Sequence, residues 1–197
     1  EESSKNRLMG DPHLKSMVAK DSVNQASALV LTRWETAKSL GVADRAIFLH
    51  GHATGSEPQV LNRKSLGQSE AMTAAYRNAL AGAGIEAAQV GAADLYSCFP
   101  IAVWVAMDAL DMSLDDPRPF TLTGGLPFFG GPGNNYSTHG IAEMVHWLRA
   151  QPEPAYGVVG ANGGYLSKHA VGVYANMPAK FPEAVPEFKA AEVVEVV

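Results

Sequence analysis

The sequence predicts a single α/β domain in which helices cover a layered sheet. Segments with strand-like and helical patterns alternate along the 197 residues, which suffice for one good-sized domain or two small ones. Apolar residues make up 47% of the chain and charged residues 18%, as in a compact globular protein with a large core. The sequence shows no internal repeat and no low-complexity linker. These observations favour one continuous α/β layer structure.

Uncharged runs of β-branched and leucine residues predict the strands, and apolar residues at helical spacing predict the helices. Strands are expected at residues 26–32, 45–55, 92–98 and 118–125, with a hairpin of two strands at 156–175 that turns at its Asn-Gly-Gly. Helices are expected at 33–41, 69–84, 99–110 and 141–150. The helix at 99–110 is apolar on nearly every side, so we expect it to be central and buried.

The only cysteine, Cys98, lies between a predicted strand and a predicted helix. A thiolate is the reactive form of cysteine, and the free N–H groups at the start of a helix favour it. Free cysteines are also among the most buried residues and commonly pack as small hydrophobic side chains. Taken by itself, this motif favours packing over chemistry.

The loop Gly124–Gly140 has six glycines, two prolines and two asparagines between a predicted strand and a predicted helix. Glycines allow the backbone to approach a ligand closely, and free N–H groups there could hold a carbonyl oxygen or a phosphate. A bare turn rarely needs this length, so we expect the loop to be functional. His139, at its end, is equally well interpreted as a proton carrier or as a helix-end hydrogen bonder.

Two further motifs carry less weight. The segment Gly160–His169, taken by itself, is interpreted as a hairpin turn. His50 and His52 hint at a metal, but the sequence offers no further ligands at credible spacing, and no metal site is predicted. No phosphate-binding G-x-x-x-x-G-K-[ST] motif is present.

Composition excludes several classes of function. The net charge of −5 gives no basic surface for nucleic acid or for an anionic membrane. The longest apolar run, near Ile101–Met107, is far too short to span a bilayer. A single cysteine cannot form an internal disulfide, and no signal peptide is visible, so we expect a cytoplasmic protein. The first residue is not Met, and we expect the chain to continue beyond both ends.

Order and spacing join these motifs into one pattern. The chain resembles the C-terminal half of a thiolase, most closely the sterol-carrier-protein-2 type and its thiolase-like relatives. Val23–Leu31 is similar to the family's "sDGAAAvvl" segment, and Tyr96–Phe99 stands where the family has His-Asp-Cys-Phe. Gly124–Gly140 is similar to the "GG…GHPxGxSG" loop, and residues 161–174 to the "HNxGxGGA" hairpin. The resemblance runs from about Lys5 to Tyr174.

The resemblance implies a layered α-β-α half of the thiolase fold, with a mixed five-stranded sheet around a buried helix. It implies a thiolase-like acyltransferase of the acetyl-CoA C-acetyltransferase type that acts on acyl-CoA thioesters in lipid metabolism, with this chain supplying the acid/base and oxyanion half of the site. Coenzyme A is then a substrate, and no cofactor is tightly bound. The nucleophilic cysteine belongs to an N-terminal half that this chain lacks, in the same protein or a cleaved fragment, and the whole is expected to form a homo-oligomer.

The site residues follow from the matching positions. Cys98 is the expected acid/base that moves a proton at the α-carbon, and Tyr96 is a further catalytic candidate. His139 matches no family position and is a catalytic candidate as a substitute for the missing histidine of Gly-His-Pro. Tyr96 replaces the family's histidine, Gly131 replaces the histidine of Gly-His-Pro, and Ala161 replaces the histidine of the last hairpin. The expected substrate-binding residues are Gly130, Gly131, Asn134, Asn135, Gly163 and Gly164.

These departures keep two other functions open. One is a retro-aldolase on a CoA thioester that uses Tyr96, and the other is a catalytically degenerate acyl-CoA-binding protein. For the domain organisation, we expect an irregular arm at 1–20, a thiolase-like domain at 21–178 and a tail or the start of a further domain at 179–197.

Overall fold

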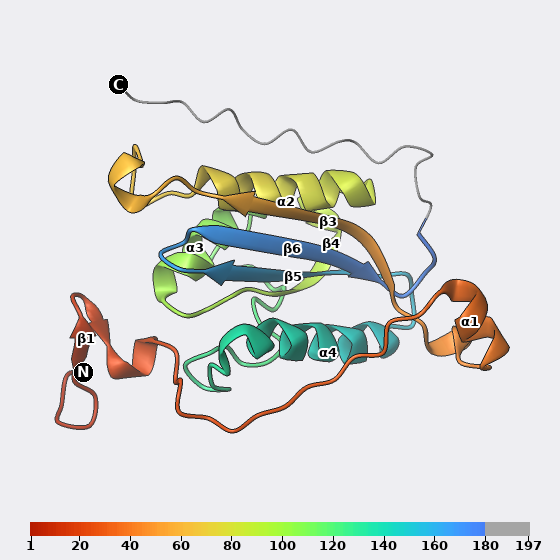
Figure 1. Cartoon of the computed structure of the whole chain (residues 1–197), viewed down its shortest axis with the longest axis horizontal. Coiled ribbons are helices and arrows are strands. Elements are labelled where there is room, and N and C mark those ends of the chain that lie inside the picture. The colour runs from red at the N-terminus through yellow and green to blue at the C-terminus, as the bar shows by residue number, and fades with distance from the viewer. Residues whose placement is uncertain (180–197) are drawn as a thin grey trace.

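The computed structural model describes residues 1–179 and has a mixed sheet between layers of helices. The strands are β3 (Phe48–Ser56), β4 (Val90–Asp94), β5 (Tyr156–Gly163) and β6 (Lys168–Ala175), in the spatial order β3-β6-β5-β4. β4 and β5 are parallel, and the other pairs are antiparallel. Helices α2 (Glu70–Ala83) and α3 (Pro100–Ala109) cover one face, and α4 (Tyr136–Arg149) covers the other (Figure 1). The predicted α-β-α fold class is therefore confirmed.

The strand expected at 118–125 is an irregular segment, and the main sheet has four strands instead of the expected five. The segment follows β4 only briefly. The amide of Ala93 donates to the carbonyl of Pro119 at 3.0 Å, and the amide of Leu95 donates to that of Phe120 at 2.9 Å. The amides of Leu122 and Thr123 donate instead to the side chain of Asp94 in β4, so the segment does not continue as a strand of the sheet.

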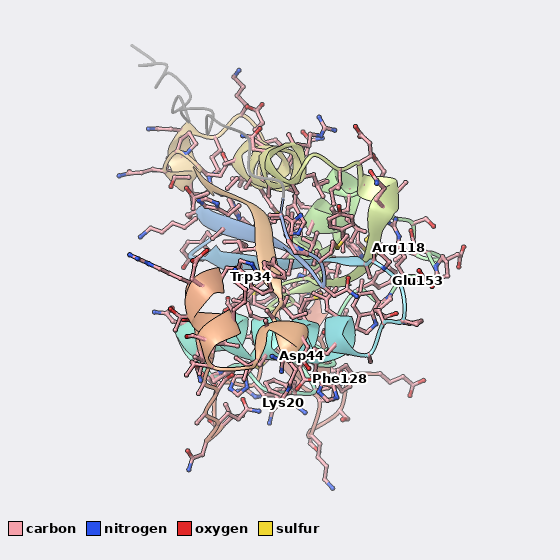
Figure 2. All side chains as sticks on the ribbon, turned by 90° about the vertical axis from the view of Figure 1, so that its right-hand side faces the viewer. Lys20, Trp34, Asp44, Arg118, Phe128 and Glu153 are labelled. Carbon is pink, nitrogen blue, oxygen red and sulfur yellow. The ribbon has the colours of Figure 1, made fainter. Side chains whose placement is uncertain are left out.

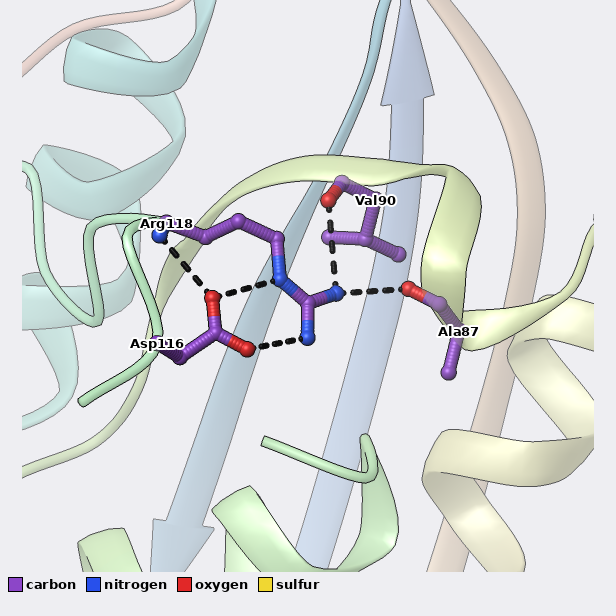
Figure 3. A network of polar contacts seen from close by, with 4 residues as sticks. All are labelled: Ala87, Val90, Asp116 and Arg118. Atoms are coloured by element: carbon purple, nitrogen blue, oxygen red, sulfur yellow. Dashed lines mark hydrogen bonds and ion pairs between the residues drawn. The ribbon is translucent and has the colours of Figure 1, made fainter. Parts of the chain in front are cut away.

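A polar network fixes the start of this segment. The Arg118 guanidinium forms a forked ion pair with Asp116 and donates to the carbonyls of Ala87 and Val90 (Figure 3). Ala87 lies in the short helix η4 (Ala87–Gln89), just before β4. The network thus attaches the chain after α3 to the beginning of β4.

The strand expected at 26–32 is wrong. Residues 18–33 form no regular element, and within residues 1–179 no strand pairs with them. Val30 and Leu31 are 94% and 89% exposed, so these apolar side chains do not pack against the other residues of 1–179. A strand needs a hydrogen-bonded neighbour, and the local pattern carries no information about whether one is present.

Most helix boundaries follow local signals. The hydroxyl of Ser69 accepts from the amide of Met72 to cap α2, and Gly84 ends this helix in the left-handed conformation. Pro100 occupies the first turn of α3. Helix α1 (Trp34–Ser39) lies at the end of the molecule that faces the viewer in Figure 2, with the Trp34 ring 5.2 Å from that of Phe48.

Helix α4 begins at Tyr136, five residues before the predicted start at Ile141. The short helix η5 (Gly133–Asn135) leads into it. The expected loop ran as far as Gly140, but this glycine lies within the helix and allows close packing: a Cβ on it would lie 2.9 Å from Oδ1 of Asp94. His139 is therefore in the first turn of α4 and not in a loop.

Helix α3 is buried on one side only within this chain. Val105, Ala106 and Ala109 are buried in the core that α3 shares with α2 and the sheet, whereas Trp104 is 51% exposed. The expectation that this helix is buried on all sides is not met within residues 1–179, because α2 and the sheet cover only one of its sides.

The remaining elements are short. The chain begins with a small hairpin, β1 (Leu8–Gly10) and β2 (His13–Leu14), followed by η1 (Lys15–Met17), and η2 (Ala43–Arg45) and η3 (Val60–Asn62) flank β3. The β5–β6 hairpin reverses at residues 164–167, slightly later than predicted. In the described part of the chain, no helix has the length and apolarity to cross a membrane. Beyond Ala179, the expected tail lies outside the described residues.

Candidate active site

Parallel pairing of β4 and β5 brings Cys98 close to an asparagine that the sequence analysis did not select. Cys98 lies between β4 and α3, and Asn162 lies near the end of β5. The side-chain amide of Asn162 donates to the Cys98 sulfur at 4.0 Å, and both residues are half-buried. The Asn-Gly-Gly sequence predicted a turn at this position, which obscured the role of Asn162 as a strand residue that faces the thiol.

Burial raises the pKa of the Cys98 thiol above its ordinary value. Hydrogen bonds from Asn162 and from backbone amides oppose this effect but do not overcome it. We expected the start of α3 to lower the pKa of Cys98, but the desolvation of the thiol outweighs any such effect. At neutral pH the side chain is a thiol, which can donate a proton to a carbanion.

Tyr96 is half-buried on the same segment, and its ring meets that of Tyr136 edge-on at 5.4 Å. Burial raises the pKa of the Tyr96 phenol, and a negative charge on Cys98 would raise it further. Tyr96 is consequently a protonated phenol near neutral pH. This state suits a hydrogen-bond donor better than a base.

A chain of aromatic contacts connects Tyr96 with His139. The Phe129 ring lies 6.1 Å from that of Tyr136 and 5.1 Å from the His139 imidazole. Nε2 of His139 lies 3.3 Å from the side-chain amide of Asn135. The structure thus places His139 at the far end of an aromatic row that begins at Tyr96.

An irregular segment at residues 19–25 lies between the thiol and the glycine loop. The amide of Ala19 donates to the Cys98 carbonyl at 3.0 Å, and Gly131 donates to the Lys20 carbonyl at 2.6 Å. Gln25 donates to the Phe129 carbonyl at 2.7 Å. Figure 2 shows Lys20 and Phe128 at the same end of the molecule, below α4. Local sequence offers no signal for these contacts because the three regions are far apart in the chain.

The other expected binding residues differ in their surroundings. Gly130 has φ +112°, and a Cβ there would lie 2.7 Å from a Val23 methyl group. Asn134 is exposed in η5, whereas Gly163 ends β5 and Gly164 begins the turn of the hairpin. The amide of Gly131 already donates to the Lys20 carbonyl, so it is not free to hold a substrate oxygen.

Asp94, which the sequence did not single out, lies two residues before Tyr96. It is completely buried at the end of β4. One carboxylate oxygen, Oδ2, accepts from the amides of Leu122 and Thr123 at 2.8 and 3.0 Å and from two threonine hydroxyls. A lone aspartate at a strand end carries no sequence signal for such a network.

The histidines of β3 do not form a metal centre. Nε2 of His50 lies 2.7 Å from the Met177 carbonyl, and its ring stacks edge-on against Tyr156. Among residues 1–179, no group of three or more His, Cys, Asp or Glu side chains is arranged to hold a metal ion.

A scan against protein-family models and a search of curated proteins both found no match. Among solved structures, the chain is similar to a monomeric SCP2-thiolase-like protein type 1 from Mycobacterium smegmatis, with 47% sequence identity and a TM-score of 0.85. The match covers 92% of this chain and 40% of the mycobacterial chain. At this identity and coverage of the present sequence, the chain belongs to the thiolase-like proteins of the SCP2 type, although it spans only 40% of the length of this relative.

Proposed function

We propose that this chain supplies the acid/base part of a thiolase-like acyltransferase site that acts on acyl-CoA thioesters. The contact between the Cys98 thiol and the Asn162 amide carries the proposal. A solitary packing cysteine needs no polar side chain directed at its sulfur. Here the thiol lies at a strand end of an α/β sheet, where ligands commonly bind.

In the cleavage direction, a nucleophile from outside this chain attacks the ketone of a β-ketoacyl-CoA. The bond between the α- and β-carbons breaks, and its electron pair remains as an enolate of the departing acyl-CoA. The Cys98 thiol donates its proton to the α-carbon, and the resulting thiolate takes up a proton before the next turnover. In the condensation direction, the thiolate removes the same proton. The nucleophile belongs to the expected N-terminal half, and coenzyme A is a substrate.

The state of Tyr96 supports this reaction over the retro-aldolase. A retro-aldol cleavage needs a base to remove the proton of a β-hydroxyl group, and the raised pKa of the Tyr96 phenol makes it a poor base. A protonated Tyr96 can instead donate a hydrogen bond to a thioester carbonyl. The expected homo-oligomer stays a prediction, and the mycobacterial relative is described as monomeric.

The test compares Cys98→Ala with the unchanged full-length protein in thiolysis of acetoacetyl-CoA. Loss of the acid/base group should lower turnover by about 10²- to 10⁴-fold. Ser113→Ala, a small exposed change beyond the other end of α3, serves as the matched control. Equal turnover in Cys98→Ala would reject the proposal. Coenzyme A binding without turnover in the unchanged protein would favour the non-catalytic acyl-CoA-binding protein.

A further inference from the structure

We propose that Asp94 is a positioning residue that holds both ends of the glycine loop against the segment that carries Tyr96 and Cys98. The inference rests on the proposed function, because it assigns the loop's fixed position to catalysis. Asp94 lies two residues before Tyr96 and is fully buried, so its contacts are shielded from solvent. A carboxylate that accepts several hydrogen bonds in a buried place holds its donors strongly.

The first end of the loop is fixed through two threonines. The hydroxyls of Thr121 and Thr123 lie 3.0 and 3.2 Å from Oδ2 of Asp94 and donate to it. The same hydroxyls accept from the amides of Gly124 and Gly125, each at 3.1 Å. Both glycines have positive φ values, +95° and +81°, and the threonines hold this unusual path.

The second end is fixed through Tyr136, the first residue of α4. Its hydroxyl lies 2.7 Å from Oγ1 of Thr123. Thr123 has one hydroxyl hydrogen, which it uses toward Asp94, so Tyr136 is the donor in this contact. Burial and the charge of Asp94 raise the pKa of Tyr136 to about 12, which keeps the phenol protonated.

The loop is also attached to the residue beside the thiol. The amide of Leu126 donates to Oγ of Ser97 at 3.0 Å, and a Cβ on Gly125 would lie 2.8 Å from the same oxygen. Ser97 precedes Cys98 directly. Asp94, Thr123, Tyr136 and Ser97 therefore connect both loop ends with the catalytic segment, and we call this set of residues the Asp94 clamp.

Thr123 offers a matched pair of variants that tests the clamp in the full-length protein. Thr123→Val keeps the shape of the side chain and removes its hydroxyl, whereas Thr123→Ser keeps the hydroxyl. A loosened loop should affect the transition state more than substrate binding, so Thr123→Val should lower kcat about tenfold and change KM for acetoacetyl-CoA less than about twofold. Thr123→Ser should stay within about threefold of the unchanged protein in both constants.

Hydrogen exchange provides a readout that is independent of activity. In Thr123→Val, the amides of residues 124–126 should exchange at least about tenfold faster, while those of β6 keep their rates. If Thr123→Val does not fold, Tyr136→Phe replaces it in the test. This variant removes only the hydroxyl at the second end and should also speed the exchange of the loop amides. Equal loop exchange in the valine and serine variants would overturn the inference, as would an unchanged kcat in Thr123→Val. Cys98→Ala, which does not disturb the clamp, tests the proposed function separately, so that its failure can be distinguished from failure of the present inference.

Discussion

At the scale of single residues, the contact between Asn162 and Cys98 partly offsets the effect of burial on the acidity of the thiol. Burial raises the pKa of Cys98, and the Asn162 amide opposes that shift by stabilising the thiolate. Asn162→Ala should therefore move the pKa of Cys98 further up. The pH dependence of iodoacetamide alkylation, followed by mass spectrometry of the Cys98 peptide, measures this pKa. Asn62→Ala, an exposed asparagine in η3, is the matched control. An unchanged midpoint in Asn162→Ala would show that the amide does not act on the sulfur.

His139 was predicted either as a proton carrier or as a helix-end hydrogen bonder, and a single substitution separates these roles. If His139 transfers a proton, His139→Ala should lower kcat by about a hundredfold with little change in protein stability. His146→Ala removes an exposed histidine from the same helix and should leave kcat unchanged. Turnover at the normal rate in His139→Ala would leave His139 with a structural role, through its hydrogen bond to Asn135 and its packing against Phe129.

At the scale of elements, the ion pair of Arg118 and Asp116 stabilises the connection between α3 and β4. Hydrogen bonds from Arg118 lower the pKa of Asp116 from its ordinary value of 3.8 to about 2. Because the folded pKa is the lower one, the stabilisation is complete well above pH 4 and is lost as the pH falls toward 2. Arg118→Ala should lower Tm at pH 7 by a few degrees, and the difference from the unchanged protein should shrink between pH 4 and pH 2. Exposed Arg33→Ala should show no such trend.

Elements whose signals are local could be predicted from the sequence. Helix α2 has its Ser69 cap, its apolar spacing and Gly84 within one continuous segment, so its bounds were predicted closely. Residues 26–32 have an equally apolar pattern, but a strand exists only with a partner, and here Val30 and Leu31 are exposed. The loop was expected to include Gly140, because the role of this glycine, which allows α4 to approach Asp94 closely, depends on a tertiary contact.

The same distinction applies to the site. Tyr96, Cys98 and the glycine loop were selected because their order along the chain resembles a known pattern. Asn162 and Asp94 were missed because their importance comes from residues brought together by β4–β5 pairing and by the turn after Thr121. Sequence order carries the first kind of information, and only the fold carries the second.

At the scale of the whole molecule, the two faces of the sheet have separate cores. The larger lies between the sheet and helices α2 and α3, and the smaller, with Met144 and Leu148 of α4, lies on the opposite face. β4 contributes to both cores, with Ala93 in the larger and Ala92 in the smaller, and the Asp94 carboxylate at its end lies against α4 at Gly140. The candidate site is thus supported from both faces of the sheet.

The outer side of α3 is one of the apolar surfaces that stay exposed within residues 1–179. Trp104 is 51% exposed there, and Leu114 beyond the helix is 73% exposed. We predict that the expected N-terminal half packs against this side in the full-length protein. Trp104→Lys should then lower the Tm of that protein by several degrees, because a charge would be placed in an apolar contact.

Leu61→Lys provides the reference for this measurement, since Leu61 is 96% exposed in η3 and a lysine there should leave Tm within about 1 °C. If Trp104 faces solvent in the full-length protein, the two variants should behave alike, because exposed substitutions rarely change stability. A large decrease in Tm for Trp104→Lys alone would therefore place this side of α3 inside the molecule. That result would also explain why a helix with apolar residues on nearly every side shows an exposed side when residues 1–179 are considered alone.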